Sequence, residues 1–225
     1  MTCAPSPSLA AALARCGDDC TRDLVDELEA ADATLVSHGA GVAQIAVKLG
    51  WRLGIAGRRL DTLCRAALLH DIGKRYVPRE VLDKPGPLLT HERQLVEAHA
   101  AVGASMLMQA GLRDEAAVVR NHHERWDGTG YPDRLRGDAI PLESRIILVA
   151  DTFDAMTSDR PYRAAIPRAG ALAEIERVAG SQLDPSAAAL VGDALAAIGT
   201  CDDPGRGPGP EATRGCDPRT GSRAA

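Results

Sequence analysis

Residues 63–74 read Leu-Cys-Arg-Ala-Ala-Leu-Leu-His-Asp-Ile-Gly-Lys, an apolar stretch that ends in a histidine and an aspartate. Leu63, Ala66, Ala67 and Leu68 recur at three- and four-residue spacing, which is the period of a helix with one apolar face. The pattern is interrupted at 71–73, Asp-Ile-Gly. The stretch therefore predicts a helix whose end carries a histidine and an aspartate side by side.

The same helical period continues on both sides of this stretch. It appears in 24–35 and 42–49, and further helices are predicted over 91–110, 113–124, 142–157, 168–179 and 185–197. Alternation of period two never lasts long enough to indicate a sheet. Two interruptions rich in Pro and Gly fall at 84–87 and 126–141. We predict an all-α fold, a single helical bundle domain over 21–203.

The composition limits the class of protein. The 225 residues are 45% hydrophobic and 25% charged, which suits a soluble globular chain and excludes a collagen or a disulfide miniprotein. No apolar run approaches the ~20 residues that span a bilayer, and no signal peptide pattern is present, so we expect a cytoplasmic location without a membrane segment. Residues 1–20 predict a loosely ordered lead-in. Residues 204–225 hold five Gly and four Pro and predict a disordered tail.

The charge and cysteine content exclude further classes. A net charge of −5 argues against a protein that binds polymeric nucleic acid. The six cysteines are scattered, and Cys16 and Cys20 have no second pair nearby, so we expect free thiols and no zinc finger. Only three of the 26 basic residues are lysines, and one of them, Lys74, lies within the opening motif.

Histidines and aspartates suggest a metal site. Taken alone, each of the six histidines is most simply an ordinary surface or core imidazole, but His70 is followed directly by Asp71, and the adjacent pair His122-His123 is followed by Glu124. Asp151 follows the apolar run 146–150, where an unpaired carboxylate would be costly to bury. Imidazoles and carboxylates together suit Fe, Mn, Zn or Co. A carboxylate such as Asp71 can bridge two ions about 3.5–4 Å apart, the arrangement that activates a hydroxide and holds a phosphoryl oxygen.

The ordered set of motifs resembles the HD-GYP domain, a branch of the HD metal-dependent phosphohydrolase superfamily. The matching stretches are Leu-His-Asp-Ile-Gly-Lys at 69–74, Lys-Pro-Gly-Pro-Leu at 84–88, His-His-Glu-Arg-Trp-Asp-Gly-Thr-Gly-Tyr-Pro at 122–132, and Asp-Thr-Phe-Asp-Ala-Met-Thr-Ser-Asp-Arg-Pro-Tyr-Arg at 151–163. The resemblance covers about 38–190. It implies an HD-type helical bundle and hydrolysis of cyclic di-GMP.

The resemblance also implies a set of site residues. The implied metal ligands are His38, His70, Asp71, His99, His122, His123 and Asp151, with Asp71 bridging two ions. His91 has no family role. Asp71 and Lys74 are the implied catalytic residues. If the helix continues past His70, Lys74 lies one turn further on the same face and can neutralise a phosphate oxygen. The expected substrate contacts are Lys74, Gly128, Gly130, Tyr131, Pro132, Arg160 and Arg163.

The Gly-Tyr-Pro loop has physical features of its own. Gly128 and Gly130 permit close backbone approach and unusual dihedral angles, and Pro132 fixes the exit. Four of the six aromatic residues, Trp126, Tyr131, Phe153 and Tyr162, fall within 126–162. They predict an aromatic wall on which a guanine can stack, although Phe153 is better explained by core packing. Arg160 is the better candidate for a phosphate or guanine contact, whereas a cap or salt bridge is an equal alternative for Arg163.

Two positions depart from the family pattern. Many members carry His-x-x-Arg-Val after the first ligand, but this chain has Gly41 in place of the arginine. Some members place a glutamate one turn before that histidine to hold a third ion, and here the residue is Thr34. We therefore expect two ions and not three. Only 37 residues precede His38, so we expect no sensory or receiver domain fused upstream.

The sequence thus predicts a dinuclear phosphodiesterase that uses Fe or Mn and hydrolyses cyclic di-GMP to linear pGpG or onward to GMP. Two alternatives stay open. One is the same chemistry on another cyclic dinucleotide or phosphoester. The other is a weakly catalytic receptor that binds cyclic di-GMP or a partner protein. A homodimer or a signalling protein is the expected macromolecular partner.

Overall fold

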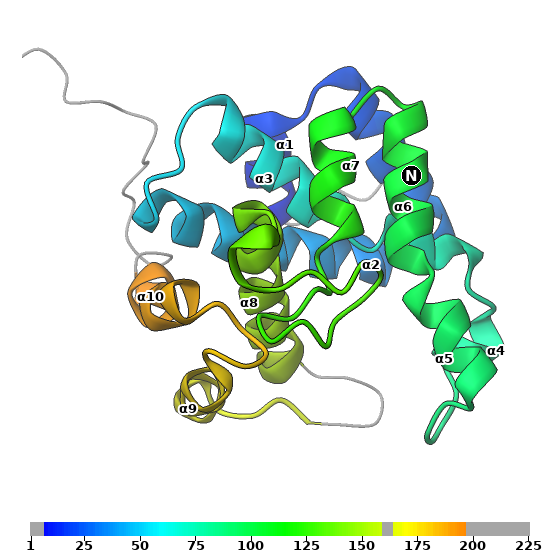
Figure 1. The fold of residues 1–225 in the computed structure, drawn as a ribbon. Coiled ribbons are helices and arrows are strands. Elements are labelled where there is room, and N and C mark those ends of the chain that lie inside the picture. Colours follow the sequence, from blue (N-terminus) through cyan, green and yellow to red (C-terminus); the bar gives the residue numbers. More distant parts are fainter. Residues whose placement is uncertain (1–6, 159–163, 197–225) are drawn as a thin grey trace, which may run out of the picture.

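The computed structural model describes residues 7–158 and 164–196, and this part of the chain is helical throughout (Figure 1). Its elements are α1 (Pro7–Cys16), α2 (Asp19–Arg52), α3 (Arg58–Leu69), η1 (Ile72–Tyr76), α4 (Arg79–Leu82), α5 (Thr90–Glu97), α6 (His99–Gln109), α7 (Arg113–Arg120), η2 (Gly137–Ala139), α8 (Leu142–Thr157), α9 (Arg168–Val178) and α10 (Pro185–Ala196). The described residues contain no strand, only an isolated bridge between Ala179 and Leu183. The all-α prediction is confirmed.

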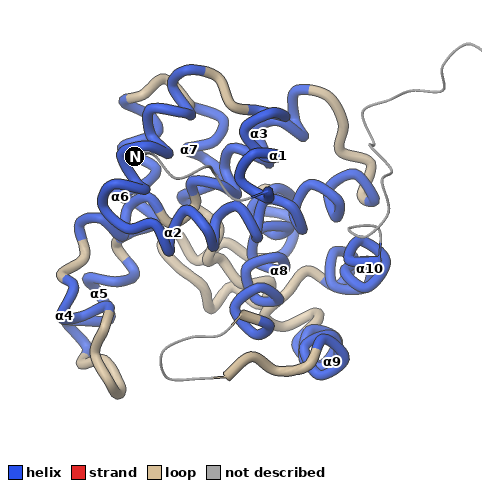
Figure 2. Tube along the Cα trace, turned by 180° about the vertical axis from the view of Figure 1, so that it is seen from behind, coloured by secondary structure: helices blue, strands red, loops and turns tan. Residues whose placement is uncertain are grey.

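Helix α2 is the spine of the bundle, and α1, α3, α8 and α10 pack against it (Figures 1 and 2). Its apolar face is buried, with Leu28, Val42 and Leu49 almost inaccessible to solvent. The helix is interrupted at Asp32, whose φ of −161° and ψ of 98° are not helical. The Asp32 carboxylate accepts hydrogen bonds from the backbone and the hydroxyl of Thr34, in the manner of an N-cap. A new helical segment therefore starts just before His38.

Two glycines allow the elements that carry the HD motif to approach their neighbours. A Cβ at Gly39 would lie 2.3 Å from the carbonyl oxygen of Leu68, where α2 crosses the end of α3. A Cβ at Gly73 would lie 2.0 Å from the carbonyl oxygen of His99, where η1 meets α6. Both contacts exclude any side chain, and they bring three separate segments together around residues 70 and 71.

The observed helices differ from the predicted ones mainly at their ends. The helix predicted over 142–157 is reproduced in full as α8, whereas the one predicted over 91–110 is divided into α5 and α6. The Nδ1 of His99 lies 2.5 Å from the carbonyl oxygen of Val96, which a continuous helix would use for its own bond. Similarly, α7 ends at Arg120, before the predicted limit of 124.

Part of the segment 1–20, expected to be a loosely ordered lead-in, forms the helix α1 (Pro7–Cys16). Leu9, Ala12 and Cys16 are buried and belong to the main hydrophobic core. These residues follow a spacing of three to four, so they pack on one face of a short helix. The tail predicted over 204–225 lies outside the described residues. Within the described part of the chain, no helix is both long enough and apolar enough to cross a membrane.

Candidate metal centre

The HD pair lies where α3 ends. His70 caps the helix, and its Nδ1 donates to the carbonyl oxygen of Ala67 at 2.8 Å, so its Nε2 faces inward. Asp71 follows and is only 3% exposed. The backbone then continues as the 3₁₀ helix η1, so the condition for Lys74 to share a face with His70, a continuing α-helix, is not met. A 3₁₀ turn nevertheless aligns residues three apart, and Nζ of Lys74 lies 2.6 Å from Oδ2 of Asp71.

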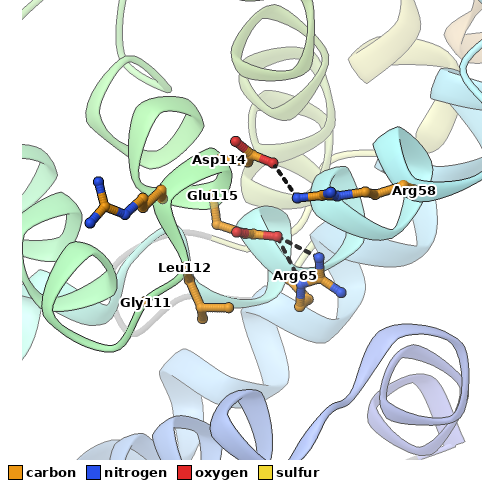
Figure 3. Close-up of a pocket in the computed structure, with 7 residues that line it drawn as sticks. Arg58, Arg65, Gly111, Leu112, Asp114 and Glu115 are labelled. Atoms are coloured by element: carbon orange, nitrogen blue, oxygen red, sulfur yellow. Dashed lines mark hydrogen bonds and ion pairs between the residues drawn. The ribbon is translucent and has the colours of Figure 1, made fainter.

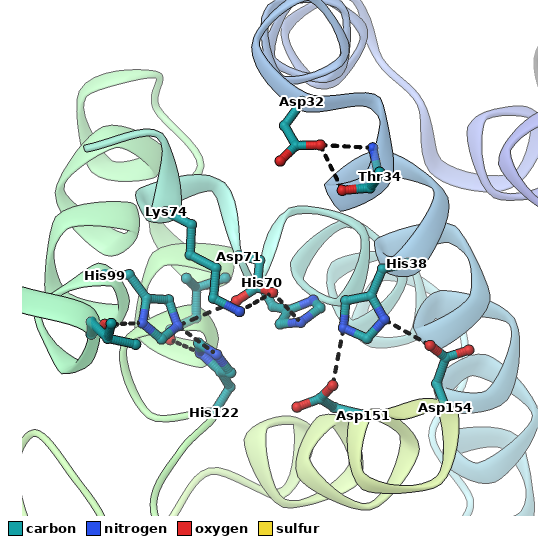
Figure 4. A network of polar contacts seen from close by, with 12 residues as sticks. Asp32, Thr34, His38, His70, Asp71, Lys74, His99, His122, Asp151 and Asp154 are labelled. Atoms are coloured by element: carbon teal, nitrogen blue, oxygen red, sulfur yellow. Dashed lines mark hydrogen bonds and ion pairs between the residues drawn. The ribbon is translucent and has the colours of Figure 1, made fainter. Parts of the chain in front are cut away.

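Asp71 lies at the centre of the site and faces histidines from two directions (Figure 4). Its Oδ2 lies 3.4 Å from Nε2 of His70, and its Oδ1 lies 3.3 Å from Nε2 of His99. Oδ1 is buried but accepts no hydrogen bond. A buried carboxylate oxygen without a donor is costly, and a cation is the partner that would satisfy it.

One group of donors lies on the α6 and α7 side of Asp71. Single donor atoms of Asp71, His99, His122 and His123 all lie within 4.8 Å of one another. The Nδ1 atoms of His99 and His122 each face a carbonyl oxygen three residues earlier, at 2.5 and 2.6 Å. A carbonyl only accepts, so both Nδ1 atoms carry hydrogen, and neutral rings leave their Nε2 lone pairs facing each other at 3.3 Å. A cation between them would remove this repulsion.

A second group lies on the α2 and α8 side and shares Asp71. Donor atoms of His38, His70 and Asp71 also lie within 4.8 Å of one another. Nε2 of His38 lies 3.0 Å from Oδ1 of Asp151, which brings the remaining predicted ligand to the edge of this group. The structure thus brings six of the predicted ligands together in two overlapping groups with Asp71 in common, and Asp151 contacts His38 of the second group.

The two groups differ in charge. Burial, together with the neighbouring His123, holds the pKa of His122 well below its ordinary value, and burial lowers the pKa of His123 to about 3. Burial also opposes protonation of His38, but hydrogen bonds to Asp151 and Asp154 outweigh it and raise its pKa to about 9. Burial would raise the pKa of Asp71, but Lys74 and His70 hold it well below its ordinary range.

These observations make the cluster a suitable metal site. It offers imidazole nitrogens and ionised carboxylates, which are the donors that divalent first-row metals take. A cation would satisfy both the unpaired Oδ1 of Asp71 and the facing Nε2 atoms of His99 and His122.

The Gly-Tyr-Pro loop lies against the same cluster. The ring of Tyr131 packs on that of His123 with centroids 4.9 Å apart. This tyrosine, an expected substrate contact, therefore covers a predicted metal ligand. Gly128 has a φ of +80°, and a Cβ at Gly130 would lie 2.3 Å from the backbone nitrogen of Arg125. Gly128 thus adopts an unusual dihedral angle, and Gly130 permits a close backbone approach; both uses were expected of these glycines. Pro132 follows Tyr131 and is half-buried.

Other predicted residues lie elsewhere. The ring of Trp126 packs under the guanidinium of Arg145, at 5.4 Å, and Phe153 is buried in the core. His91 is exposed on α5, in keeping with an ordinary surface histidine. Arg160, Tyr162 and Arg163 lie outside the described residues.

Two acids at the site were missed by the sequence analysis. The buried carboxylate of Glu124 accepts hydrogen bonds from the backbone nitrogens of Asp133 and Leu135, and so holds the loop that follows Tyr131. Asp154 contacts His38, with its Oδ2 2.7 Å from Nδ1. The sequence offered one signal for each acid. Glu124 directly follows the predicted ligand His123, and Asp154 lies one helical turn beyond the predicted ligand Asp151.

A surface pocket of about 230 Å³ lies apart from the cluster, between α3 and α7 (Figure 3). Glu115 accepts two hydrogen bonds from Arg65 there, at 2.6 and 2.8 Å, and Asp114 pairs with Arg58. None of the predicted ligands lines this pocket. Its principal charges satisfy one another, so it offers no comparable site.

Comparisons with known proteins place the chain in a family of helical domains. The family model described as HD domain matches residues 22–187. The chain is 43% identical over 159 residues to the 3'3'-cGAMP-specific phosphodiesterase 3 of Vibrio cholerae serotype O1, a match that covers 70% of this chain and 35% of that protein. It is 40% identical over 153 residues to the cyclic di-GMP phosphodiesterase response regulator RpfG of Xanthomonas campestris pv. campestris, covering 67% of this chain and 39% of that protein.

A solved structure is similar as well. An HDG"Y"P protein from Bdellovibrio bacteriovorus matches with a TM-score of 0.60 at 22% identity, over 73% of this chain and 53% of that one. This likeness concerns the fold. The chain spans well under half the length of the two curated relatives.

Proposed function

The chain belongs to the HD domain family, and from that premise we propose that it is a metal-dependent phosphodiesterase that hydrolyses cyclic di-GMP to linear pGpG. One observation carries the proposal. Six histidine and aspartate side chains from separate segments converge in two groups that share Asp71, a buried oxygen of that residue accepts no hydrogen bond, and Asp151 contacts His38 of one group.

Two ions, iron or manganese, are proposed for the two groups. His38, His70, Asp71 and Asp151 would hold one, and Asp71, His99, His122 and His123 would hold the other. When bound, such a pair supplies Lewis acidity and a nucleophile at neutral pH for the displacement at phosphorus. Asp71 contributes by staying ionised between the two groups, since its pKa is held well below the ordinary range by Lys74 and His70.

Lys74 is proposed to neutralise charge on the phosphate. Its ammonium is partly exposed and lies 2.6 Å from Asp71, at the side of the cluster rather than among the ligands. An ammonium in that position can donate to a phosphoryl oxygen as negative charge develops there. Tyr131 and the Gly128–Pro132 loop would border the bound nucleotide, and Arg160 and Arg163 stay candidate contacts from the sequence alone.

The name of one relative favours a second substrate, 3'3'-cGAMP. The relative that is 43% identical carries the name of a 3'3'-cGAMP-specific enzyme, while RpfG carries that of a cyclic di-GMP phosphodiesterase. Both substrates are cyclic dinucleotides with the same phosphodiester linkage to break. The same metal centre therefore serves either, and the choice between them rests on contacts to the base.

A receptor without catalysis is the less favoured alternative. A protein that only binds a cyclic dinucleotide has no need of six converging ligands and a buried anionic bridge. The charge missing at Gly41 is the observation that favours this alternative, since an arginine there would add a positive group near the site.

Product analysis tests the proposal. The full chain, loaded anaerobically with Fe²⁺ or with Mn²⁺, is incubated separately with cyclic di-GMP and 3'3'-cGAMP, and the products are separated by ion-pair chromatography. We expect pGpG from cyclic di-GMP, with any GMP appearing later. Asp71→Asn should be inactive, and His91→Ala, a change of an exposed histidine outside the cluster, should match the wild type.

The outcomes separate the alternatives. Faster turnover of 3'3'-cGAMP would assign that nucleotide as the substrate and keep the chemistry. Tight binding of either nucleotide without hydrolysis, with both metals present, would contradict an enzyme and favour the receptor.

A further inference from the structure

His38 is held between two carboxylates of the same helix. Its Nε2 faces Asp151, and its Nδ1 donates to Oδ2 of Asp154 at 2.7 Å. Asp151 and Asp154 lie three residues apart on α8, so both point towards α2 (Figure 4). Asp154 is not among the predicted ligands, and its oxygen is on the side of the ring that faces away from the cluster.

Three of the other cluster histidines orient their rings differently. Nδ1 of His70, His99 and His122 lies 2.5–2.8 Å from the carbonyl oxygen three residues earlier in each case. Such a carbonyl can accept this bond because these residues stand at or beside a helix end, where the last carbonyls lack their i+4 helical partner.

His38 has no such carbonyl available. It lies well inside α2, which runs from Asp19 to Arg52, where backbone carbonyls already accept helical hydrogen bonds. An imidazole binds a metal through one nitrogen, and a partner for its other N–H fixes which nitrogen that is. A side-chain acceptor must therefore replace the backbone, and Asp154 supplies it.

Gly41 provides the room for Asp154. It lies one turn after His38, and a Cβ built there would lie 2.8 Å from Oδ1 of Asp154. A Cβ at 41 would require the carboxylate, which is the movable end of a flexible residue, to shift from its observed position. Gly41 has ordinary helical backbone in α2, so alanine would suit the helix itself better than glycine does.

We propose that Asp154 is a positioning residue that directs Nε2 of His38 towards the metal centre, and that Gly41 is the residue that leaves it space to do so. The inference rests on the proposed metal centre. With this assignment, the glycine at position 41 has a steric explanation. The loss of the arginine charge alone does not provide one.

Metal titration of the full chain tests this assignment. Protein stripped with a chelator is titrated with Mn²⁺ by calorimetry, and melting temperatures are recorded for the metal-free forms. For Asp154→Ala we expect one of two equivalents to bind about 10- to 100-fold more weakly, the range typical of lost ligand partners. Asp154→Asn keeps a carbonyl acceptor for the N–H and should recover most of the affinity.

Gly41→Ala is the second arm. It should weaken the same equivalent while the metal-free melting temperature stays equal or rises, because the change favours the helix. Combined with Asp154→Ala it should cause no further loss, since the carboxylate that it displaces is already absent. Should Asp154→Ala not fold, this variant alone decides the matter.

Glu143→Ala is the matched control. Glu143 is a largely buried acid on the same helix that pairs with Arg59 and not with the cluster. It should lower the melting temperature and leave both equivalents unchanged. Wild-type affinity in both Asp154→Ala and Gly41→Ala would overturn the assignment, whereas a wild-type protein that binds no Mn²⁺ would instead overturn the proposed function.

Discussion

Two acids of this protein are equally buried and have opposite surroundings. The side chains of Glu115 and Asp71 are each 4% exposed. Glu115 accepts two hydrogen bonds from Arg65 across the contact between α7 and α3. Asp71 faces Lys74 on one oxygen, while its other oxygen accepts no hydrogen bond and lies near the Nε2 of His99.

This difference separates a structural charge from a functional one. A buried pair that satisfies itself has little to offer a ligand, whereas a buried carboxylate left open among neutral imidazoles is completed by a cation. Burial alone does not distinguish the functional acid from the structural one. The missing partner distinguishes them, and the following variants exploit that distinction.

The largest effect is expected for Asp71→Asn. The amide removes the charge shared by the two metal groups, so turnover should fall below detection while the fold persists. The measurements are hydrolysis of cyclic di-GMP and metal content by elemental analysis. His122→Ala should cost one ion per chain. Turnover comparable to the wild type in pure Asp71→Asn protein would refute the role of this residue.

Glu115→Ala should show the reverse pattern. It leaves Arg65 half-buried without its partner, and breaking a buried pair costs about 3–5 kcal/mol of unfolding free energy. Urea unfolding measures this loss. Metal content and kcat of the folded fraction should stay at wild-type values, and a loss of metal would show that the two regions are coupled.

A smaller loss is expected for Lys74→Ala. Removing one donor to developing negative charge typically lowers kcat by about a hundredfold. Metal content should be nearly unchanged because the ammonium contacts Asp71 from outside the ligand set. Equal turnover would mean that Lys74 is only a solvated partner of Asp71, and loss of metal would mean that its role is structural.

The smallest effect concerns the number of ions. Thr34 is exposed, and its hydroxyl donates to Asp32 at 2.6 Å, so the wild type offers no carboxylate one turn before His38. Two ions per chain are therefore expected, and Thr34→Glu should bring the content towards three. Three ions in the wild type would contradict the expectation, while no change in the variant would show that position 34 does not face the site.

Much of the fold was predictable because helical periodicity is local. The limits of α8 follow directly from the sequence, and the all-α class is confirmed. The helix ends were harder, since His99 and His122 take carbonyls that a longer helix would use. The sequence aligned Lys74 with His70 on condition of a continuing α-helix, but a 3₁₀ turn follows His70 and pairs Lys74 with Asp71.

The site was predictable only as far as motifs reach. Five of the seven proposed ligands occur in the matching stretches, whereas His38 and His99 lie outside them. Asp154 and Gly41 act across the contact between α2 and α8, between residues more than a hundred positions apart, and no spacing within one helix reports such a contact. The missing arginine at 41 was visible in the sequence, but the space that glycine leaves was not.

The most direct test of the central claim is an anomalous-scattering map from crystals of the manganese-loaded chain. We predict two peaks, one among Asp71, His99, His122 and His123, and one among His38, His70, Asp71 and Asp151, with Asp71 contacting both. A map with no peak at this cluster, or with a single ion that Asp71 does not contact, would contradict the account.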